Sequence, residues 1–313
     1  MKKKETLIDA GWGIKNKKGL VLRGDFTYSD GSTYSGSVKS LQKKIPHGHG
    51  TFRYIDGKVY SGGWKNNQYH GYGTLIQPEG NKSHFDSFKY IGQFKNNKIH
   101  GKGKMIFDNQ SLMPLNRKYV GQFKDDQFHG KGTFSSEEEK YVGEWYYGSR
   151  HGRGTEILNK DAFRNKYTDG GKLTYKGLYQ FDKFHGKGTI TWEDGAKYNG
   201  QFKDNYRHGK GTIIWPDGEK YIGQWKYDFQ NGQGTIILSD GEKRVGKFKD
   251  NSMQGRGIIT FLKGHTREGD KSLVIMKDNQ VIKYKHVLPK LKKNEPPYKW
   301  TDFFDQPDNL INF

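Results

Sequence analysis

Residues 198–220 read YNGQFKDNYRHGKGTIIWPDGEK, and residues 221–243 directly after them read YIGQWKYDFQNGQGTIILSDGEK. Both segments begin with Tyr-x-Gly-x-aromatic, continue with His-Gly-x-Gly or Asn-Gly-x-Gly, and close with Asp-Gly. Self-similarity at a fixed period of roughly 20–50 residues is typical of repeat proteins, in which one small unit is used many times. The two segments therefore predict a repeat fold with a regular period of 23 residues.

The same unit recurs nine times along the chain, and a half unit at residues 24–36 precedes the first. The opening residues of the nine units are Tyr34, Tyr60, Tyr90, Tyr119, Tyr141, Tyr175, Tyr198, Tyr221 and Arg244. The histidine position holds His47, His70, His100, His129, His151, His185, His208, Asn231 and Gln254. The offset between the two positions is ten residues in every unit except the first, where it is thirteen. This fixed internal spacing makes the repeat highly specific.

Three insertions interrupt the regular period, near residues 78–88, 108–117 and 158–173. They always fall in the same half of the unit. Insertions of this kind form loops on one side of a repeat array, often the side that binds partners.

Each unit has the pattern of a β-hairpin. Side chains alternate between the two faces of a strand, so Tyr141, Gly143 and Trp145 lie on one face, and Gly152 and Gly154 are expected to share one face as well. Asp-Gly pairs, as at Asp56-Gly57, favour tight turns between strands. The predicted structural residues of the repeat are Tyr60, Gly62, Trp64, Tyr141, Gly143, Trp145, Tyr198, Gly200, Phe202, Tyr221, Gly223 and Trp225.

Glycine inside a strand is destabilising and often marks a close approach by another group. We expect an aromatic side chain from a neighbouring strand or repeat to cover each strand glycine. Nine hairpins predict about eighteen antiparallel strands, and at ~4.8 Å per strand such a sheet is about 85–90 Å long. The predicted fold is all-β: an elongated, single-layer antiparallel β-meander with short irregular N- and C-terminal segments.

The pattern resembles the MORN repeat (membrane occupation and recognition nexus) over residues 24–261. The resemblance implies an elongated, trough-like β-meander. It also implies a set of cellular settings, namely radial spoke heads of cilia and flagella, the cytoskeleton of protists, and membrane junctions.

Composition agrees with a repeat protein and excludes several classes. The chain has 313 residues, 43 of them Gly, and no Cys, which excludes a disulfide scaffold and a Cys nucleophile. Ala occurs only at positions 10, 162 and 196, which disfavours a helical bundle. No apolar segment follows the basic residues 2–4, and none approaches the ~20 residues of a membrane span. These features favour a soluble cytoplasmic protein.

The predicted organisation has four parts. They are a basic N-terminal segment (1–23), the repeat array (24–261), a capping hairpin (262–286), and a Pro/Lys-rich linker with an aromatic tail (287–313). Lys277-Asp278-Asn279-Gln280 forms the expected turn of the capping hairpin, which would close the open edge of the sheet. The aromatic tail has two interpretations: it folds back onto the trough, or it docks into a partner.

No catalytic, cofactor or metal site is predicted. The motif histidines of successive units lie two strands apart, about 10 Å, whereas zinc needs several ligands within ~2.1 Å of the metal. We therefore interpret them as turn and sheet packing residues. No nucleophile elbow, Walker-type loop or HExxH motif is present.

The formal net charge of +20 is partly arranged in rows that repeat with the unit. The candidate partner-binding residues are Lys102, Lys131, Arg153, Lys187, Lys210 and Arg256 of the motif, and Trp300, Phe303, Phe304 and Phe313 of the tail. The rows have three interpretations: solubility of a large sheet, docking of an acidic protein surface, and binding of anionic lipid. Nucleic acid is disfavoured, because the aromatic residues are committed to covering glycines.

The predicted function is a non-catalytic scaffold that presents a β-surface to other proteins of a ciliary, radial-spoke-like or cytoskeletal assembly. The alternative is a peripheral membrane module that binds anionic phospholipid. The two open edges of the sheet would also allow two copies to pair.

Overall fold

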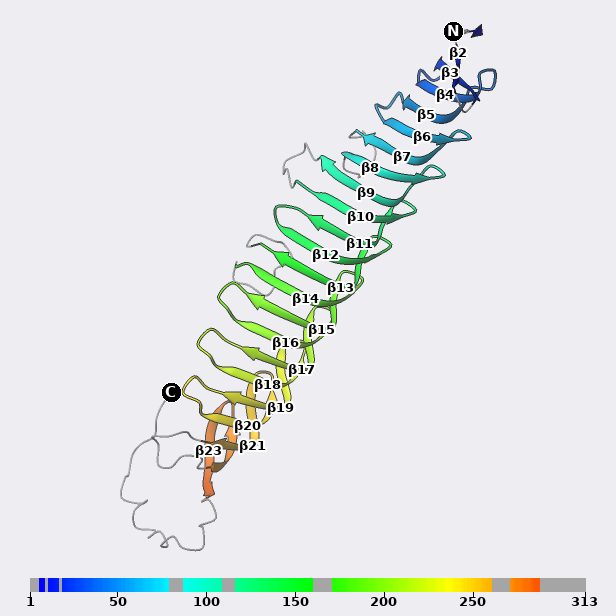
Figure 1. Ribbon diagram of the computed structural model, residues 1–313. Helices are drawn as coiled ribbons and strands as arrows, with labels where there is room; N and C mark the ends of the chain where they lie inside the picture. The colour runs from blue at the N-terminus through cyan, green and yellow to red at the C-terminus, as the bar shows by residue number, and fades with distance from the viewer. Residues whose placement is uncertain are drawn as a thin grey trace, which may run out of the picture.

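The computed structural model describes residues 6–8, 11–16, 19–78, 87–108, 116–159, 171–260 and 271–287. These residues form one antiparallel sheet of 23 strands and no helix. Figure 1 shows the strands stacked in a single elongated row, with β2 at one end and β23 at the other.

Each strand from β2 to β22 pairs with the strand before it and the strand after it, so that the whole sheet is a meander. The strands are β1 (Thr6–Ile8), β2 (Gly11–Asn16), β3 (Gly19–Thr27), β4 (Thr33–Ser40), β5 (Ile45–Arg53), β6 (Val59–Lys65), β7 (Gln68–Gln77), β8 (Ser87–Lys95), β9 (Lys98–Asp108), β10 (Lys118–Lys124), β11 (Gln127–Ser135), β12 (Glu139–Tyr146), β13 (Ser149–Leu158), β14 (Leu173–Gln180), β15 (Lys183–Trp192), β16 (Lys197–Lys203), β17 (Tyr206–Ile214), β18 (Lys220–Lys226), β19 (Phe229–Ile237), β20 (Lys243–Lys249), β21 (Ser252–Thr260), β22 (Lys271–Lys277) and β23 (Gln280–Val287).

The nine repeat units correspond to β4–β21, which are the eighteen strands that nine hairpins predict. The hairpin expected around residues 277–280 is present as β22 and β23. The N-terminal segment is not irregular in its described part, because β1, β2 and the start of β3 continue the sheet. Pairing with β2 satisfies backbone groups that β3 would otherwise expose.

The two edges of the array carry different turns. On one edge the turns from β6 onward have two residues, both with positive φ, as at Asn66 and Asn67 (50° and 66°), whereas the turn between β4 and β5 has four. This backbone is that of the hairpin turn whose twist matches the flanking strands. On the other edge lie the Asp-Gly turns, and the amide of Gly57 donates to the carbonyl of Tyr54 (3.1 Å). Asp-Gly turns are thus where the sequence predicts them, and so is the Asp278-Asn279 turn of the last hairpin, whereas the two-residue turns within the repeat units were missed.

The core is a layer of tyrosines on one face of the sheet. The opening tyrosines of the first eight units are at most 1% exposed. Tyr141 illustrates the arrangement: Gly143 and Gly154 pair across β12 and β13, and the ring of Tyr141 covers both. Tyr141 belongs to the same strand as Gly143, which differs from the expectation of a neighbouring strand. For Gly154 the covering ring does come from a neighbouring strand, as expected.

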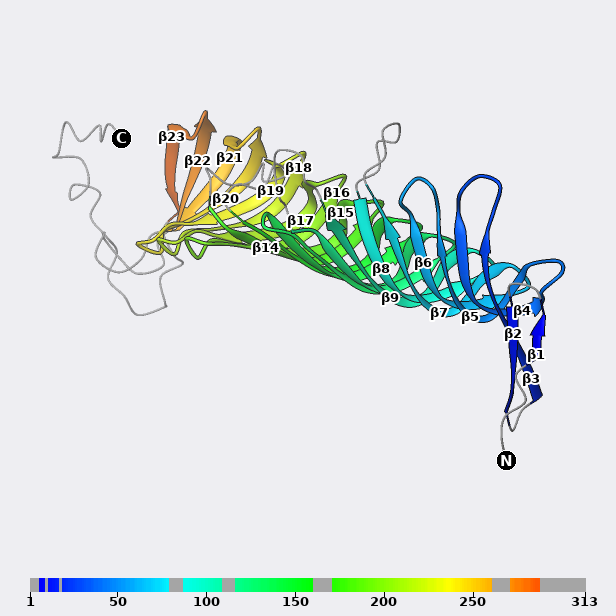
Figure 2. The same cartoon turned by 90° about the horizontal axis from the view of Figure 1, so that it is seen from above.

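Gly152 and Gly154 do not share one face, contrary to the alternation argument. Gly152 has φ of +70°, and the pairing register shifts between Gly143 and Trp145. A side chain at Gly152 would meet Glu144, whereas one at Gly154 would meet Tyr141. A β-bulge of this kind bends and twists its strand. Figure 2 shows strands that curve along their length, so that the sheet forms a long trough.

Candidate interaction surface

The inner face of the trough is occupied by the protein's own aromatic rings. Trp145 packs edge-on between Tyr119 (5.4 Å between ring centroids) and Tyr141 (5.1 Å). The same edge-on contacts alternate between an opening tyrosine and the aromatic residue four positions after an opening residue. They run from Tyr34 to Phe248 through the rings of Trp64, Tyr60, Phe94, Tyr90, Phe123, Tyr119, Trp145, Tyr141, Tyr179, Tyr175, Phe202, Tyr198, Trp225 and Tyr221. Edge-to-face pairs are favourable beyond the area they bury, so each unit is stabilised by its neighbours.

The last unit has no tyrosine and fills the same space differently. Arg244 stands where the other units have Tyr, and the methyl group of Met253 covers the pair Gly246 and Gly257. Met253 is 1% exposed, so it belongs to the core. Methionine adapts well to an irregular gap of this kind.

The outer face carries the six predicted motif cations. The side chains of this first cation row are all exposed: Lys102, Lys131, Arg153, Lys187, Lys210 and Arg256. Lys131 lies opposite Glu144 in the pairing register, and Lys187 lies opposite Gln201. Successive members are two strands apart, about 10 Å, except Lys210 and Arg256, between which Gln233 stands at the equivalent position.

A second cation row runs parallel to the first and was missed in the sequence analysis. It consists of the lysine that directly precedes the opening residue of the unit, in Lys89, Lys118, Lys140, Lys197, Lys220 and Lys243. The recurring Lys-Tyr dipeptide was the available signal. Lys140 and Glu144 are four residues apart on β12, so the two rows lie about 13 Å from each other.

A strip of small and β-branched side chains separates the two cation rows. This central strip includes the exposed residues Val120, Val142, Ile222 and Ile258, which are 41–47% exposed. Threonines lie opposite several of them in the register, as Thr133 and Thr155 do on either side of Val142. A shallow depression is lined by Lys131, Thr133, Val142, Glu144 and Arg153.

The electrostatics of this outer face are one-sided. From β8 to β21, both cation rows, the central strip and the residues opposite them in the register lie in the described part of the chain. Glu144 is the only acidic residue among them. No ion pair between described residues involves a lysine or arginine of either row. The positive charges are therefore available to an external anion.

The motif histidines connect successive units along the edge with two-residue turns. His129 packs against Tyr147 (5.1 Å between ring centroids), and His151 packs against Phe181 (5.0 Å), in each case the first turn residue of the next unit. His100 instead lies 3.8 Å from the carboxylate of Asp125. No group of three or more His, Asp or Glu among the described residues is placed to hold a metal ion.

The second turn residue clamps the same edge through its backbone and its side chain. The Asp182 carboxylate accepts a hydrogen bond from the Arg150 amide (2.9 Å), and the Asp182 amide donates to the Arg150 carbonyl (3.0 Å). The same double contact joins Asn97 to Tyr69, Asp126 to Ile99, Asn205 to Phe184, Asp228 to Arg207, Asn251 to Gln230 and Asn279 to Met253.

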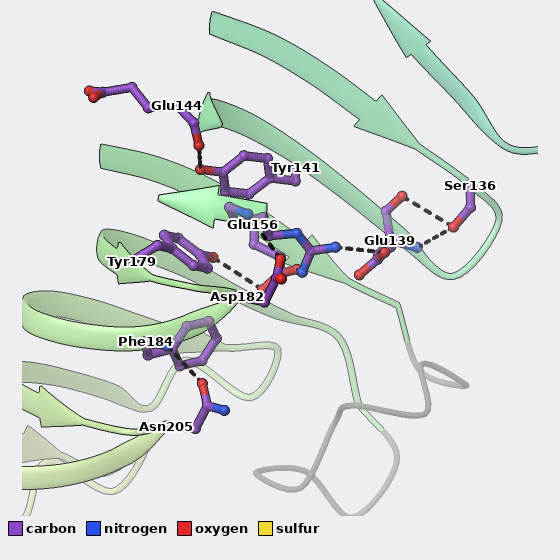
Figure 3. Close-up of polar contacts among 10 residues, drawn as sticks. Ser136, Glu139, Tyr141, Glu144, Glu156, Tyr179, Asp182, Phe184 and Asn205 are labelled. Atoms are coloured by element: carbon purple, nitrogen blue, oxygen red, sulfur yellow. Dashed lines mark hydrogen bonds and ion pairs between the residues drawn. The ribbon is translucent and has the colours of Figure 1, made fainter. Parts of the chain in front are cut away.

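One charged cluster lies on the same face of the sheet as the tyrosine layer, with side chains from β12, β13 and β14 (Figure 3). The Arg150 guanidinium contacts Glu156 and Glu139 (2.7 Å to Glu139), and the Tyr179 hydroxyl donates to Glu156 (3.1 Å). Burial raises the pKa of Tyr179 well above its usual value, and Glu156 raises it further. Burial alone would lower the pKa of Arg150, but Glu156 and Glu139 outweigh it and the pKa is raised. Glu156 is 2% exposed, so we interpret the cluster as structural.

The repeat model of one protein family matches most of the chain. The MORN repeat matches residues 42–59, 60–82, 90–112, 119–137, 141–160, 175–197, 198–220, 221–243 and 245–266. The chain belongs to the MORN-repeat family. MORN repeats are generally non-enzymatic modules that mediate protein or membrane interactions. Comparison with curated proteins gave no match.

The predicted tail residues Trp300, Phe303, Phe304 and Phe313 lie outside the described residues, and so do most residues of the three insertions. The insertions connect β7 to β8, β9 to β10 and β13 to β14, on the edge that also carries the Asp-Gly turns. In the described part of the MORN chain, no helix has the length and hydrophobicity to cross a membrane.

Proposed function

We propose that this MORN protein is a non-catalytic scaffold that holds other proteins of a large assembly along its outer face. The observation that carries the proposal is the pair of cation rows on the outer face. The inner face is already occupied by the aromatic layer, whereas the rows offer exposed, unneutralised charge along most of the array. A row of binding groups on an elongated sheet suits partners that lie lengthwise against it.

The proposed setting is a ciliary or axonemal complex of the radial-spoke type, or a cytoskeletal one. The support for it is the share of the chain that the repeats occupy, together with the settings that the family resemblance implies. Pairing of two copies through the edge strands is part of the same proposal, because edge strands offer unpaired backbone groups.

Cell fractionation tests the proposal. A tagged copy is expected to stay in the insoluble cytoskeletal or axonemal pellet after detergent, and to remain there in about 0.5 M salt, because an interface with buried contacts is less screened than exposed charges. Cross-linking of that pellet then identifies the neighbours. Complete release by detergent alone contradicts the scaffold.

The second candidate function is binding of anionic membrane lipid, and the same cation rows favour it. Basic residues near an anionic membrane surface contribute about 1 kcal/mol each. Binding to vesicles that contain phosphatidylserine is then expected to fall steeply between low and high salt, since exposed charges are screened. Lack of binding at low salt contradicts this candidate.

A further inference from the structure

The two cation rows and the central strip between them, here called the track, have the dimensions of one helix. We propose that the track binds an acidic amphipathic α-helix lying along the array. The apolar stripe of that helix would rest on the central strip, and its acidic flanks would meet the two cation rows. The inference rests on the proposed scaffold function and names the chemistry of its partner.

The spacing along the track matches a heptad. Equivalent positions of successive units lie two strands apart, ~9.6 Å, and between its first and last cation each row skips one unit, at Gln233 in the first row and at Thr174 in the second. Residues seven apart on a helix are separated by ~10.5 Å. The difference of about 1 Å per step is within the reach of flexible lysine side chains. Glutamates at one heptad position can therefore meet Lys131 and Arg153 in turn.

The spacing across the track matches the width of a helix. The rows are about 13 Å apart, and a helix with its side chains is ~10–12 Å wide. Lys118 and Lys140 would flank the helix on one side, with Lys131 and Arg153 on the other. Opposite charges on both flanks fix the position and the register of a helix, as charges beside a coiled-coil seam do.

The central strip supplies the apolar contact between these flanks. Val142 is 47% exposed, and with Thr133 it lines the depression between Lys131 and Arg153. At Thr133, Val142 and Thr155 the strip side chains are shorter than the cations on either side, so that the cations form the walls of a shallow groove there. Lys104 and Lys176 interrupt the strip elsewhere. A lipid headgroup would use the cations only, whereas a helix would use the cations and the strip together.

Nucleic acid is a poorer fit to this surface. Single-stranded nucleic acid is held by aromatic side chains on which its bases stack. Between β8 and β21 the central strip consists of Val, Ile, Thr, Lys and Asn and carries no aromatic residue in this described region.

A fluorescence anisotropy experiment with the full chain tests the proposal. The probe is a labelled four-heptad peptide with leucines on one face and glutamates on both flanks, used below the concentration at which it self-associates. One control peptide has Gln in place of every Glu. A second control peptide keeps every Glu but has prolines interspersed, so it has the same charge and cannot form a helix. The helical acidic peptide is expected to bind at least tenfold more tightly than either control.

Charge-neutral variants locate the site. The combination Lys118→Gln, Lys131→Gln, Lys140→Gln and Arg153→Gln is expected to weaken peptide binding at least tenfold. The matched control, Lys65→Gln, Lys95→Gln, Lys203→Gln and Lys249→Gln, removes the same charge from the edge with two-residue turns and is expected to change the affinity less than twofold. Unchanged circular dichroism and melting temperature establish that both variants are folded. Val142→Asp is expected to weaken binding at least fivefold, because it places a carboxylate on the strip.

Three results would overturn the proposal. Equal losses in the two charge variants would mean that only net charge matters. Equal binding of the proline-interrupted peptide would mean that the track does not select a helix. Binding of phosphatidylserine vesicles without peptide binding would assign the rows to lipid. Cross-linked neighbours in the cytoskeletal pellet would still support the scaffold in each case, so the two proposals fail separately.

Discussion

Tyr141 and Gly154 lie on neighbouring strands, and the ring of Tyr141 occupies the space that a side chain at position 154 would need. The Tyr141 hydroxyl donates a hydrogen bond of 2.8 Å to the carbonyl of Glu144 on its own strand, which fixes the ring over the glycine pair. The bare glycine and the buried tyrosine therefore require each other. An aromatic side chain laid over a strand glycine shields backbone that the glycine leaves open.

Substitution of the glycine tests this dependence. Gly154→Ala is expected to lower the free energy of unfolding by about 1–3 kcal/mol, because the added methyl group must displace a fully packed ring. Urea denaturation provides the measurement. Val142→Ala on the outer face is the control and is expected to change stability by less than about 0.5 kcal/mol. Equal effects of the two substitutions would mean that the ring has room to move.

The contact between Tyr141 and Trp145 predicts coupled losses. Tyr141→Ala and Trp145→Ala are each expected to cost about 3–5 kcal/mol, as for other buried aromatic residues. The rings are in edge-to-face contact at 5.1 Å, so the double variant is expected to lose about 0.5–1.5 kcal/mol less than the sum. Tyr72→Ala, at a residue that is 63% exposed, is the control for loss of an aromatic side chain. Strict additivity, or an unchanged melting temperature, would contradict the stacked layer.

Much of the fold could be predicted from local spacing. Tyr-x-Gly-x-Trp at 141–145 places two large rings and one glycine on the same face by strand alternation alone. Repetition of that spacing then requires neighbouring hairpins to share a core. No long-range information is needed for either step, so the hairpin and the array both follow from the sequence.

Features that depend on pairing register could not be predicted in the same way. Gly152 looks like an ordinary alternating residue in HGRG, and only the bulge opposite Gly143 shows that it faces the other way. The lysines of the second cation row, such as Lys118 and Lys140, can be found in the sequence, but only the pairing register shows that the row runs parallel to the first. Tyr179 is likewise brought to Glu156 by stacking of two units, whereas Arg150 reaches Glu156 along their common strand.

The buried charges inside the trough predict an asymmetry between breaking and replacing them. Glu156→Gln is expected to cost about 3–5 kcal/mol, because Arg150 remains buried without its main counter-charge. The next units carry apolar residues at the equivalent positions, namely Phe184, Ile190 and Phe202. The triple variant Arg150→Phe, Glu156→Ile and Tyr179→Phe is therefore expected to be neutral or more stable by about 1–4 kcal/mol. Thermal unfolding of the two variants compares these outcomes, and a triple variant less stable than Glu156→Gln would show that the cluster itself stabilises the fold.

The tyrosine layer predicts alkaline unfolding. Burial raises the pKa of Tyr221 to about 12, and it raises the pKa values of Tyr60, Tyr90 and Tyr119 as well. Above the unfolded value of about 10, the unfolded chain loses phenolic protons that the native chain keeps, so stability falls as pH rises. We expect full stability below pH ~10 and its loss as pH rises toward 12 and above. Tyrosinate absorbance and circular dichroism are expected to change together for the buried group, and ionisation of these tyrosines with the sheet intact would contradict their burial.

Tyr227 predicts a gain in stability from a turn substitution. It is the first residue of a two-residue turn and has φ of +50°, in the region where Asn96 (φ 51°) stands in an earlier unit. Left-handed backbone costs a residue with a large side chain roughly 1–2 kcal/mol, whereas Asn adopts it more readily. Tyr227→Asn gives up the contacts of its half-exposed ring with His208 and Tyr206 (5.4 and 5.8 Å between centroids), which for an exposed ring together contribute at most about 1 kcal/mol. Relief of the backbone is the larger effect, and the variant is expected to be more stable by about 0.5–1 kcal/mol.

The control for this substitution is its ring partner. Tyr206 contacts Tyr227 at 5.8 Å and is similarly exposed, but it lies in β17 and has no positive φ. Tyr206→Asn therefore removes a comparable ring without relieving the backbone, and it is expected to lower stability by up to about 1 kcal/mol. Opposite signs for the two variants in thermal unfolding would assign the gain to the turn. A loss of stability in both would mean that ring contacts along this edge outweigh the backbone conformation, and that the aromatic turns stabilise the array.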